Sequence, residues 1–221
     1  MINPPNLTKS NYLRLPARSG QADALADFIT PREGTTSKSV SAATYWYALR
    51  EEKHPDRFAV FDLFADETAR EGYVAAGGPG AVRKNASNLL EEGWRMRDHA
   101  SLFSVLGSVV ADDPVDIRLI TYIPIQVADG QSEAFEELLA IGPSEVANSE
   151  PETFYWYALR DENRPGHYAI VDLYADAHGR AKHRAGDVAA TLKRNAPALV
   201  RGGWEQGVLA NVIEYEVIAS K

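Results

Sequence analysis

The sequence predicts an α+β fold made of two tandem ferredoxin-like domains, each an antiparallel sheet with helices on one face. The first reason is an internal repeat. Tyr45–Arg50 (YWYALR) recurs unchanged at Tyr155–Arg160, an offset of 160 − 50 = 110 positions that holds without a gap over most of both halves. The second reason is the order expected in each copy: strand, helix, strand, strand, helix, strand. A repeat of this length indicates a duplicated domain, since solenoid repeats span about 20–50 residues.

Each copy opens with a strand followed by a helix. Apolar residues three and four positions apart indicate the helix, and β-branched and aromatic residues indicate the strand. These elements are expected at Tyr12–Ala17 and Ala22–Ile29 in the first copy, and at Ile117–Val127 and Glu133–Ile141 in the second. Turn-forming residues follow each helix, so loops are expected over Thr30–Ser41 and Gly142–Glu152.

An aromatic-rich hairpin forms the middle of each copy, with the YWYALR segment as its first strand. Asp66 and Asp176 then stand where a helix N-cap belongs, and Gly93 and Gly203 end the second helix of each copy. The return strands are expected at Phe58–Phe64 and Tyr168–Tyr174, the second helices at Ala81–Glu92 and Val188–Arg201, and the last strands at Ser101–Val110 and Asn211–Ala219.

The domain boundary is expected at residues 111–114, where two acids and a proline interrupt the apolar pattern. This gives one domain over residues 1–111 and a second over 112–221. Apart from one Asp each, the return strands are apolar on both faces, which indicates that both faces are covered. We expect helices on the outer face and the sheet of the other copy on the inner face, so that the two copies pair within the chain.

Composition excludes several classes of function. A formal charge of −8 and the absence of any Lys/Arg run argue against a nucleic-acid or anionic-membrane partner. No apolar stretch approaches the roughly 18 residues of a membrane span, and the start does not resemble a signal peptide. The absence of cysteine excludes disulfides and thiolate chemistry. The default expectation is a soluble cytoplasmic protein.

A lone carboxylate in each return strand is the first candidate for chemistry. If Arg50 pairs with Phe58 across the hairpin, Trp46 falls opposite Asp62 on one face, and in the second copy Trp156 falls opposite Asp172. A buried carboxylate is costly unless it is hydrogen-bonded or protonated, so the indole N–H or the Arg guanidinium is expected to satisfy it. A structural Asp and a base or substrate anchor of raised pKa both fit this pattern.

His183 is the second candidate. It lies in the helix after the return strand of the second copy, and Tyr73 holds the same place in the first copy. An imidazole titrates near pH 6.5 and suits the transfer of a phenolic proton at neutral pH. An exposed helical His between Lys182 and Arg184 fits equally well. A functional His183 would leave one working copy and one degenerate copy.

The hairpin aromatics either line a pocket for a flat aromatic ligand or form plain core. A metal site is not expected, because none of the five histidines forms an i, i+4 pair or an HExxH motif. No phosphate-binding glycine loop is present either, since Gly77-Gly78-Pro79-Gly80 lacks the following Lys and Ser/Thr. We therefore expect no cofactor.

The hairpin and following helix of both copies, YWYALREEKHPDRFAVFDLFADETAREGY and YWYALRDENRPGHYAIVDLYADAHGRAKH, resemble the core of antibiotic biosynthesis monooxygenase (ABM) domains. The second copy keeps the family's helical His at His183. The resemblance implies a dimeric α+β barrel, assembled here within one chain, with further homodimerisation left open. Activities in the family include cofactor-free oxidation of quinols and polyphenols, and haem degradation in a related branch.

The leading hypothesis is a cofactor-independent monooxygenase that oxidises a quinol or polyphenolic aromatic with O2. A non-catalytic small-molecule-binding or stress-related protein is the alternative, and haem binding or degradation is a third. The expected catalytic residues are His183, Asp172 and Trp156. The expected substrate-binding residues are Tyr155, Tyr157, Arg160, Tyr73, Trp46 and Asp62.

Overall fold

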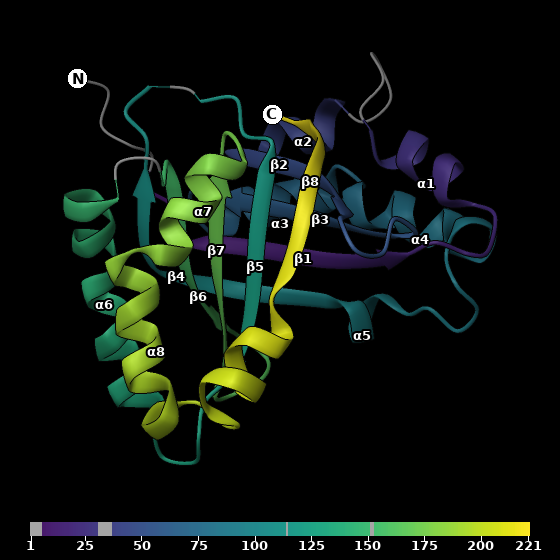
Figure 1. Ribbon diagram of the computed structural model, residues 1–221. Coiled ribbons are helices and arrows are strands. Elements are labelled where there is room, and N and C mark those ends of the chain that lie inside the picture. Colours follow the sequence, from purple (N-terminus) through teal and green to yellow (C-terminus); the bar gives the residue numbers. More distant parts are fainter. Residues whose placement is uncertain (1–5, 31–36, 114, 151–152) are drawn as a thin grey trace. The chain divides into compact units, whose positions relative to one another are not determined.

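Figure 1 shows the computed structural model, which describes residues 6–30, 37–113, 115–150 and 153–221. In each copy a strand and a helical segment precede a hairpin, and two further helices lead to the last strand. The first copy comprises β1 (Lys9–Pro16), α1 (Ala22–Ile29), α2 (Ser37–Ala42), β2 (Tyr45–Glu51), β3 (Arg57–Phe64), α3 (Glu67–Ala75), α4 (Gly78–Leu89), α5 (Met96–His99) and β4 (Ala100–Val110).

The second copy repeats this order, with one long helix, α6, in place of α1 and α2. It comprises β5 (Leu119–Gln126), α6 (Ser132–Ser149), β6 (Tyr155–Asp161), β7 (His167–Tyr174), α7 (Ala177–Ala185), α8 (Asp187–Leu199), a π-helical segment (Gly203–Val208), a 3₁₀ turn (Leu209–Asn211) and β8 (Ile213–Ser220). The element order confirms the predicted α+β class, with antiparallel pairing of the central strands.

The last strand of each copy leaves its own copy. One compact unit contains residues 6–103 with Tyr215–Lys221, and its strand order is β1-β3-β2-β8; the other contains Ser104–Glu214 and the order β5-β7-β6-β4. Each unit thus contains strands from both copies. The copies therefore pair within the chain. The predicted boundary at residues 111–114 stays a prediction, and Pro114 lies outside the described residues.

The hairpin register agrees with the expectation from the repeat. Arg50 lies opposite Phe58, and Trp46 lies opposite Asp62. In the second copy Trp156 lies opposite Asp172 in the same way. Since side chains alternate between the faces of a strand, each Trp shares a face with the Asp of its own hairpin.

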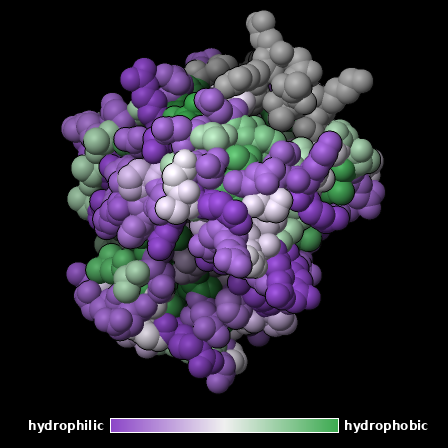
Figure 2. All heavy atoms as spheres, turned by 90° about the vertical axis from the view of Figure 1, so that its right-hand side faces the viewer, coloured by the Kyte–Doolittle hydropathy of each residue, from purple (hydrophilic) through white to green (hydrophobic). Residues whose placement is uncertain are grey.

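Each unit has its own apolar core. In the second copy the β6/β7 face that carries Trp156 and Tyr168 packs against Phe135 and Leu139 of α6 and Leu192 of α8. In the first copy the equivalent face packs against helices α1 to α4 in the same manner. These faces are the helix-covered faces of the sheets. On the face of the molecule in Figure 2, by contrast, hydrophilic residues predominate and hydrophobic residues gather in small groups.

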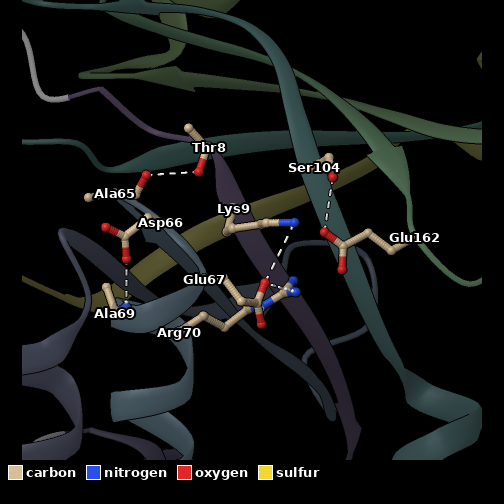
Figure 3. Close-up of polar contacts among 9 residues, drawn as sticks. All are labelled: Thr8, Lys9, Ala65, Asp66, Glu67, Ala69, Arg70, Ser104 and Glu162. Atoms are coloured by element: carbon tan, nitrogen blue, oxygen red, sulfur yellow. Dashed lines mark hydrogen bonds and ion pairs between the residues drawn. The ribbon is translucent and has the colours of Figure 1, made fainter.

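Helix starts follow the predicted capping. The Asp66 side chain accepts a hydrogen bond of 2.8 Å from the Ala69 N–H at the start of α3 (Figure 3). In α7, Asp176 accepts from the N–H groups of His178 and Gly179 at 2.9 Å each. These bonds satisfy donors that the first turn of a helix leaves without a backbone partner. Asp176 thereby fixes the first turn of the helix that carries His183.

The loop expected over Gly142–Glu152 is wrong, because α6 continues through Gly142 and Pro143 to Ser149. The reason is tertiary packing. A Cβ at Gly142 would lie 2.5 Å from the Trp156 ring, so glycine here lets the helix rest directly on the indole. In the first copy the expected loop Thr30–Ser41 overlaps α2 from residue 37 onward, while residues 31–36 lie outside the described part.

Replacing Gly142 by Ala is expected to lower the free energy of unfolding by about 1–3 kcal/mol, the usual cost of overpacking a core. Gly72→Ala in α3 is the matched control, since a Cβ there meets nothing within 4 Å. This control is expected to gain up to about 1 kcal/mol from helix propensity alone. Urea unfolding of both variants measures the difference, and equal effects would contradict the close contact with Trp156.

Candidate active site

His183 is buried in the second copy, where only 6% of it is exposed. The α7 helix carries it beside the helix-covered face of β7, next to the Tyr174 ring at a centroid distance of 5.7 Å. The alternative of an exposed helical His is therefore wrong. The neighbours Lys182 and Arg184 point to a charged helix surface in the sequence, but the helical turn aims the side chain between them inward.

Two carboxylates flank the imidazole. Nδ1 forms a hydrogen bond with Oε2 of Glu150, and the Thr153 hydroxyl lies 3.2 Å from the same nitrogen. On the other side, Nε2 lies 3.4 Å from Oδ1 of Asp172, within ion-pair distance. All four residues are buried. The two ring nitrogens of His183 thus face acids from two different elements.

Local backbone features position Glu150. It is the C-cap residue of α6, and its Oε1 accepts a hydrogen bond of 3.0 Å from the Val188 N–H in the first turn of α8. A Cβ at Gly186 would lie 2.2 Å from that same oxygen. The absence of a side chain at Gly186 therefore makes room for the carboxylate at the junction of α7 and α8.

The three groups shift one another's protonation. Burial raises the pKa of Asp172, an effect that His183 partly offsets. Burial also acts to lower the pKa of His183, but Asp172 and Glu150 together outweigh it and hold that pKa above its usual value. For Glu150, the His183 contacts and the Val188 N–H overcome burial and lower the pKa. The arrangement favours imidazolium between the two acids.

The expected partners of Asp172 are wrong. The Trp156 indole nitrogen has no hydrogen-bond partner among the described residues, although it lies on the same face. The Arg160 guanidinium is exposed and pairs with Glu136 at 3.3 Å. His183 takes their place, since an imidazole from α7 reaches the carboxylate from above the sheet while the indole ring packs under Gly142.

The first copy builds the same place from different residues. Tyr73 occupies the position of His183, and Asp62 that of Asp172. Burial raises the pKa of Asp62 to about 8, and hydrogen bonds from Tyr73 and Asn11 offset part of that rise. Val40 stands where the second copy has Glu150, because 150 − 110 = 40, and it is buried in the apolar core. This copy therefore has one acid, largely protonated at neutral pH, and no imidazole.

The predicted site residues divide between two faces of each sheet. His183, Asp172 and Trp156 lie together on the helix-covered face. Tyr155 and Tyr157 alternate with Trp156 and so point to the opposite face, both of them buried. Tyr73, Trp46 and Asp62 form the corresponding group in the first copy. Arg160 is exposed and lies beside Glu136.

Glu150 and Thr153 are missing from the sequence-based candidates. An alignment of the copies at the offset of 110 contains the signal, because Glu150 and His183 of the second copy correspond to Val40 and Tyr73 of the first. An acid and a base are thus gained or lost together. The pair of Glu150 and His183 is not predicted, because Glu150 is expected in a loop and the pattern of a loop does not indicate which residues lie beside it.

Within the described ranges, no group of three His, Cys, Asp or Glu residues is arranged to hold a metal ion. Haem ligation through His183 is not supported by the geometry either, because both ring nitrogens already face carboxylates. Of the helices that the structure describes, none is long and apolar enough to cross a membrane.

No protein-family model and no curated protein matches the chain. Solved structures do match over nearly the whole length. A protein from Fusobacterium nucleatum named "putative monooxygenase" has a TM-score of 0.76 at 12% identity, covering 97% of this chain and 94% of that one. A protein of the same name from Lactobacillus acidophilus has a TM-score of 0.69 at 9% identity, covering 97% and 95%.

A third solved structure, an "anthrone oxidase-like protein", has a TM-score of 0.56 at 14% identity and covers 99% of this chain and 94% of that one. Identities this low establish the fold alone. The agreement extends over both copies, so these neighbours also carry both halves in one polypeptide. The chain therefore has the tandem ferredoxin-like α+β barrel fold of these monooxygenase-like proteins, as its resemblance to ABM domains implies.

Proposed function

We propose that the protein is a cofactor-independent monooxygenase that acts on a quinol-like or polyphenolic small molecule with its second copy. The observation that carries this proposal is the buried His183 imidazole held between Glu150 and Asp172. The names of the structural neighbours, two of them "putative monooxygenase" and one "anthrone oxidase-like protein", support the same class of chemistry.

The reaction needs little from the protein besides proton transfer and a dry site. Removal of a phenolic proton gives an anion that can itself reduce O2, and the Asp172–His183 pair is the proposed proton acceptor. For an anthrone-type substrate, the ring CH2 becomes C=O while the second oxygen atom leaves as water with the two hydrogens. O2 is thus the only oxidant, and no external reductant is consumed.

The second copy is the better candidate for this role. Two acids hold the pKa of the His183 imidazole above its usual value, whereas burial keeps the pKa of the Tyr73 hydroxyl well above its usual value. In the first copy the buried Asp62 accepts hydrogen bonds from Tyr73 and Asn11, both of them neutral. A phenol that is hard to ionise is a poor base at neutral pH.

O2 uptake by metal-free protein with a panel of quinols and an anthrone tests the proposal. His183→Gln is expected to lower the protein-dependent rate by about 10²-fold, the lower end of the contribution of a general acid–base residue. Tyr73→Phe removes the corresponding group of the first copy and is expected to leave the rate within about twofold of wild type. Equal losses in both variants would contradict a site in the second copy.

A non-catalytic small-molecule binder is the second candidate, and the burial of the three groups is the observation that argues for a role other than catalysis. Glu150, Asp172 and His183 are each at most 7% exposed, which also fits a polar network that only stabilises the fold. Uptake no faster than autoxidation with every substrate, together with saturable binding of an aromatic that persists in His183→Gln, would replace the monooxygenase by the binder.

A further inference from the structure

We infer that Glu150 is a positioning residue for His183: it orients the imidazole, keeps the proton on Nδ1 and so makes Nε2 the nitrogen that exchanges protons. This inference deepens the proposed function and rests on it for its catalytic meaning. The hydrogen bond between Glu150 and His183 itself can be tested whether or not an activity is found.

The two carboxylate oxygens of Glu150 have different hydrogen-bond partners. Oε1 accepts the Val188 N–H at 3.0 Å and is thereby tied to the start of α8. Oε2 faces Nδ1 of His183. A carboxylate can only accept, so Nδ1 must donate, which fixes the tautomer. Nε2 is then left to share or release a proton toward Asp172, 3.4 Å away.

Thr153 supports this arrangement from the loop that follows α6. Its hydroxyl lies 3.2 Å from Nδ1 and 3.5 Å from Oε2 of Glu150. The first copy has Ala43 at this position, since 153 − 110 = 43, and it has no carboxylate at Val40. The orienting acid, the supporting hydroxyl and the imidazole are therefore all absent from the first copy together.

The glycines beside the two sites also differ between the copies. Gly186 leaves space for the Glu150 carboxylate, and the first copy has Ala76 there, where no acid needs the space. Conversely, Gly78 leaves space for the Tyr73 ring, which a Cβ would approach to 2.7 Å, and the second copy has Val188 there. The two copies are thus fitted to different side chains, which is what a specialised second copy requires.

Several other charged groups surround His183 and must stay constant in a test. Asp172 and Tyr174 face it from β7, and Arg184 follows it on α7. Arg184 itself pairs with Glu214 of β8. The hydrogen bonds described for Glu150 include none of these groups, but its charge helps to raise the pKa of Asp172 and of Tyr174. The tautomer of His183 is therefore read together with its titration.

The test is the NMR titration of the His183 imidazole in ¹⁵N-His-labelled protein, with His183→Gln identifying its signals among the five histidines. Wild type is expected to show the Nδ1–H tautomer on the neutral side of the titration. Glu150→Gln keeps an oxygen for the Val188 N–H but removes the charge, and is expected to weaken proton binding by about tenfold, one pKa unit. Glu150→Asp keeps the charge and is expected to stay closer to wild type.

Glu145→Gln is the matched control, because Glu145 lies on the same helix but pairs with Thr191, at 3.4 Å. An unchanged His183 titration in Glu150→Gln, or an equal change in Glu145→Gln, would overturn the inference. Should Glu150→Gln not fold, the Nδ1–H tautomer in wild type and in Glu150→Asp decides, and an Nε2–H tautomer in either would overturn it.

The pH profile of O2 uptake separates this inference from the proposed function. A shifted acid limb in Glu150→Gln, matching the NMR shift, supports both. An unchanged titration beside a rate that falls in His183→Gln rejects the role of Glu150 and keeps the function. A shifted His183 titration in Glu150→Gln, in a protein that shows no O2 uptake, rejects the proposed function and supports the positioning of His183 by Glu150.

Discussion

Asp62→Asn is expected to make the protein more stable at pH 9 by about 5 kcal/mol, while changing its stability little at pH 4. Burial in the first copy raises the pKa of Asp62 to about 8, compared with 3.8 for a free Asp side chain. Each pKa unit corresponds to about 1.4 kcal/mol, so the gap of about four units sets the upper end of the effect. Asn has nearly the same shape and carries no charge at any pH.

The sign follows from which state holds the proton. Between pH 3.8 and about 8 the folded protein keeps Asp62 protonated, whereas the unfolded chain has already released that proton. The stability associated with Asp62 is therefore fully present below pH 3.8 and is lost as the pH rises, until both states are ionised above pH 8. The pH dependence from Glu150 and His183 is common to wild type and variant and cancels in the difference.

Urea unfolding at a series of pH values from 4 to 9 measures this difference. Asp113→Asn is the control, since Asp113 is exposed and its substitution is expected to shift stability by less than about 0.5 kcal/mol at every pH. Stability curves for wild type and Asp62→Asn that run parallel over the whole pH range would show that Asp62 is ionised in the folded protein, contrary to its burial.

The sequence predicts the fold well because the fold depends on local and repeated signals. The alternation in the hairpins and the capping by Asp66 and Asp176 each act within a few residues, and the repeat at an offset of 110 presents every such pattern twice. Each of them has the counterpart in the structure that its pattern indicates. The exchange of β4 and β8 between the two copies depends on contacts between residues far apart in the chain, and no local pattern in the sequence indicates it.

The candidate site is only half predictable for the same reason. Asp172 stands out as a single acid in an apolar strand, and His183 as a His where the other copy has Tyr. Glu150 does not stand out, because Gly142 and Pro143 ahead of it resemble the end of a helix. Only the Trp156 ring under Gly142 explains why the helix continues and brings Glu150 to the imidazole.

Val40→Glu is expected to destabilise the protein by about 3–5 kcal/mol at pH 8, the usual cost of a buried charge without a partner. Val40 is 8% exposed and lies in the same apolar cluster as Tyr73. The phenol cannot neutralise a carboxylate, and its pKa is already well above the usual value. At pH 5 the penalty is expected to be smaller, because a buried Glu takes up a proton there.

In an Ala76→Gly background, which supplies the space that Gly186 leaves for the Glu150 carboxylate, adding Tyr73→His to Val40→Glu is expected to recover at least half of that loss. The double variant recreates in the first copy the acid–imidazole pair that Glu150 and His183 form in the second. A double-mutant cycle measured by urea unfolding at pH 8 gives the interaction energy, expected to be about 2 kcal/mol and favourable. Strictly additive effects would mean that positions 40 and 73 do not meet as positions 150 and 183 do. A favourable coupling would show that the difference between the copies lies in these side chains, because the backbone of the first copy can already hold the pair.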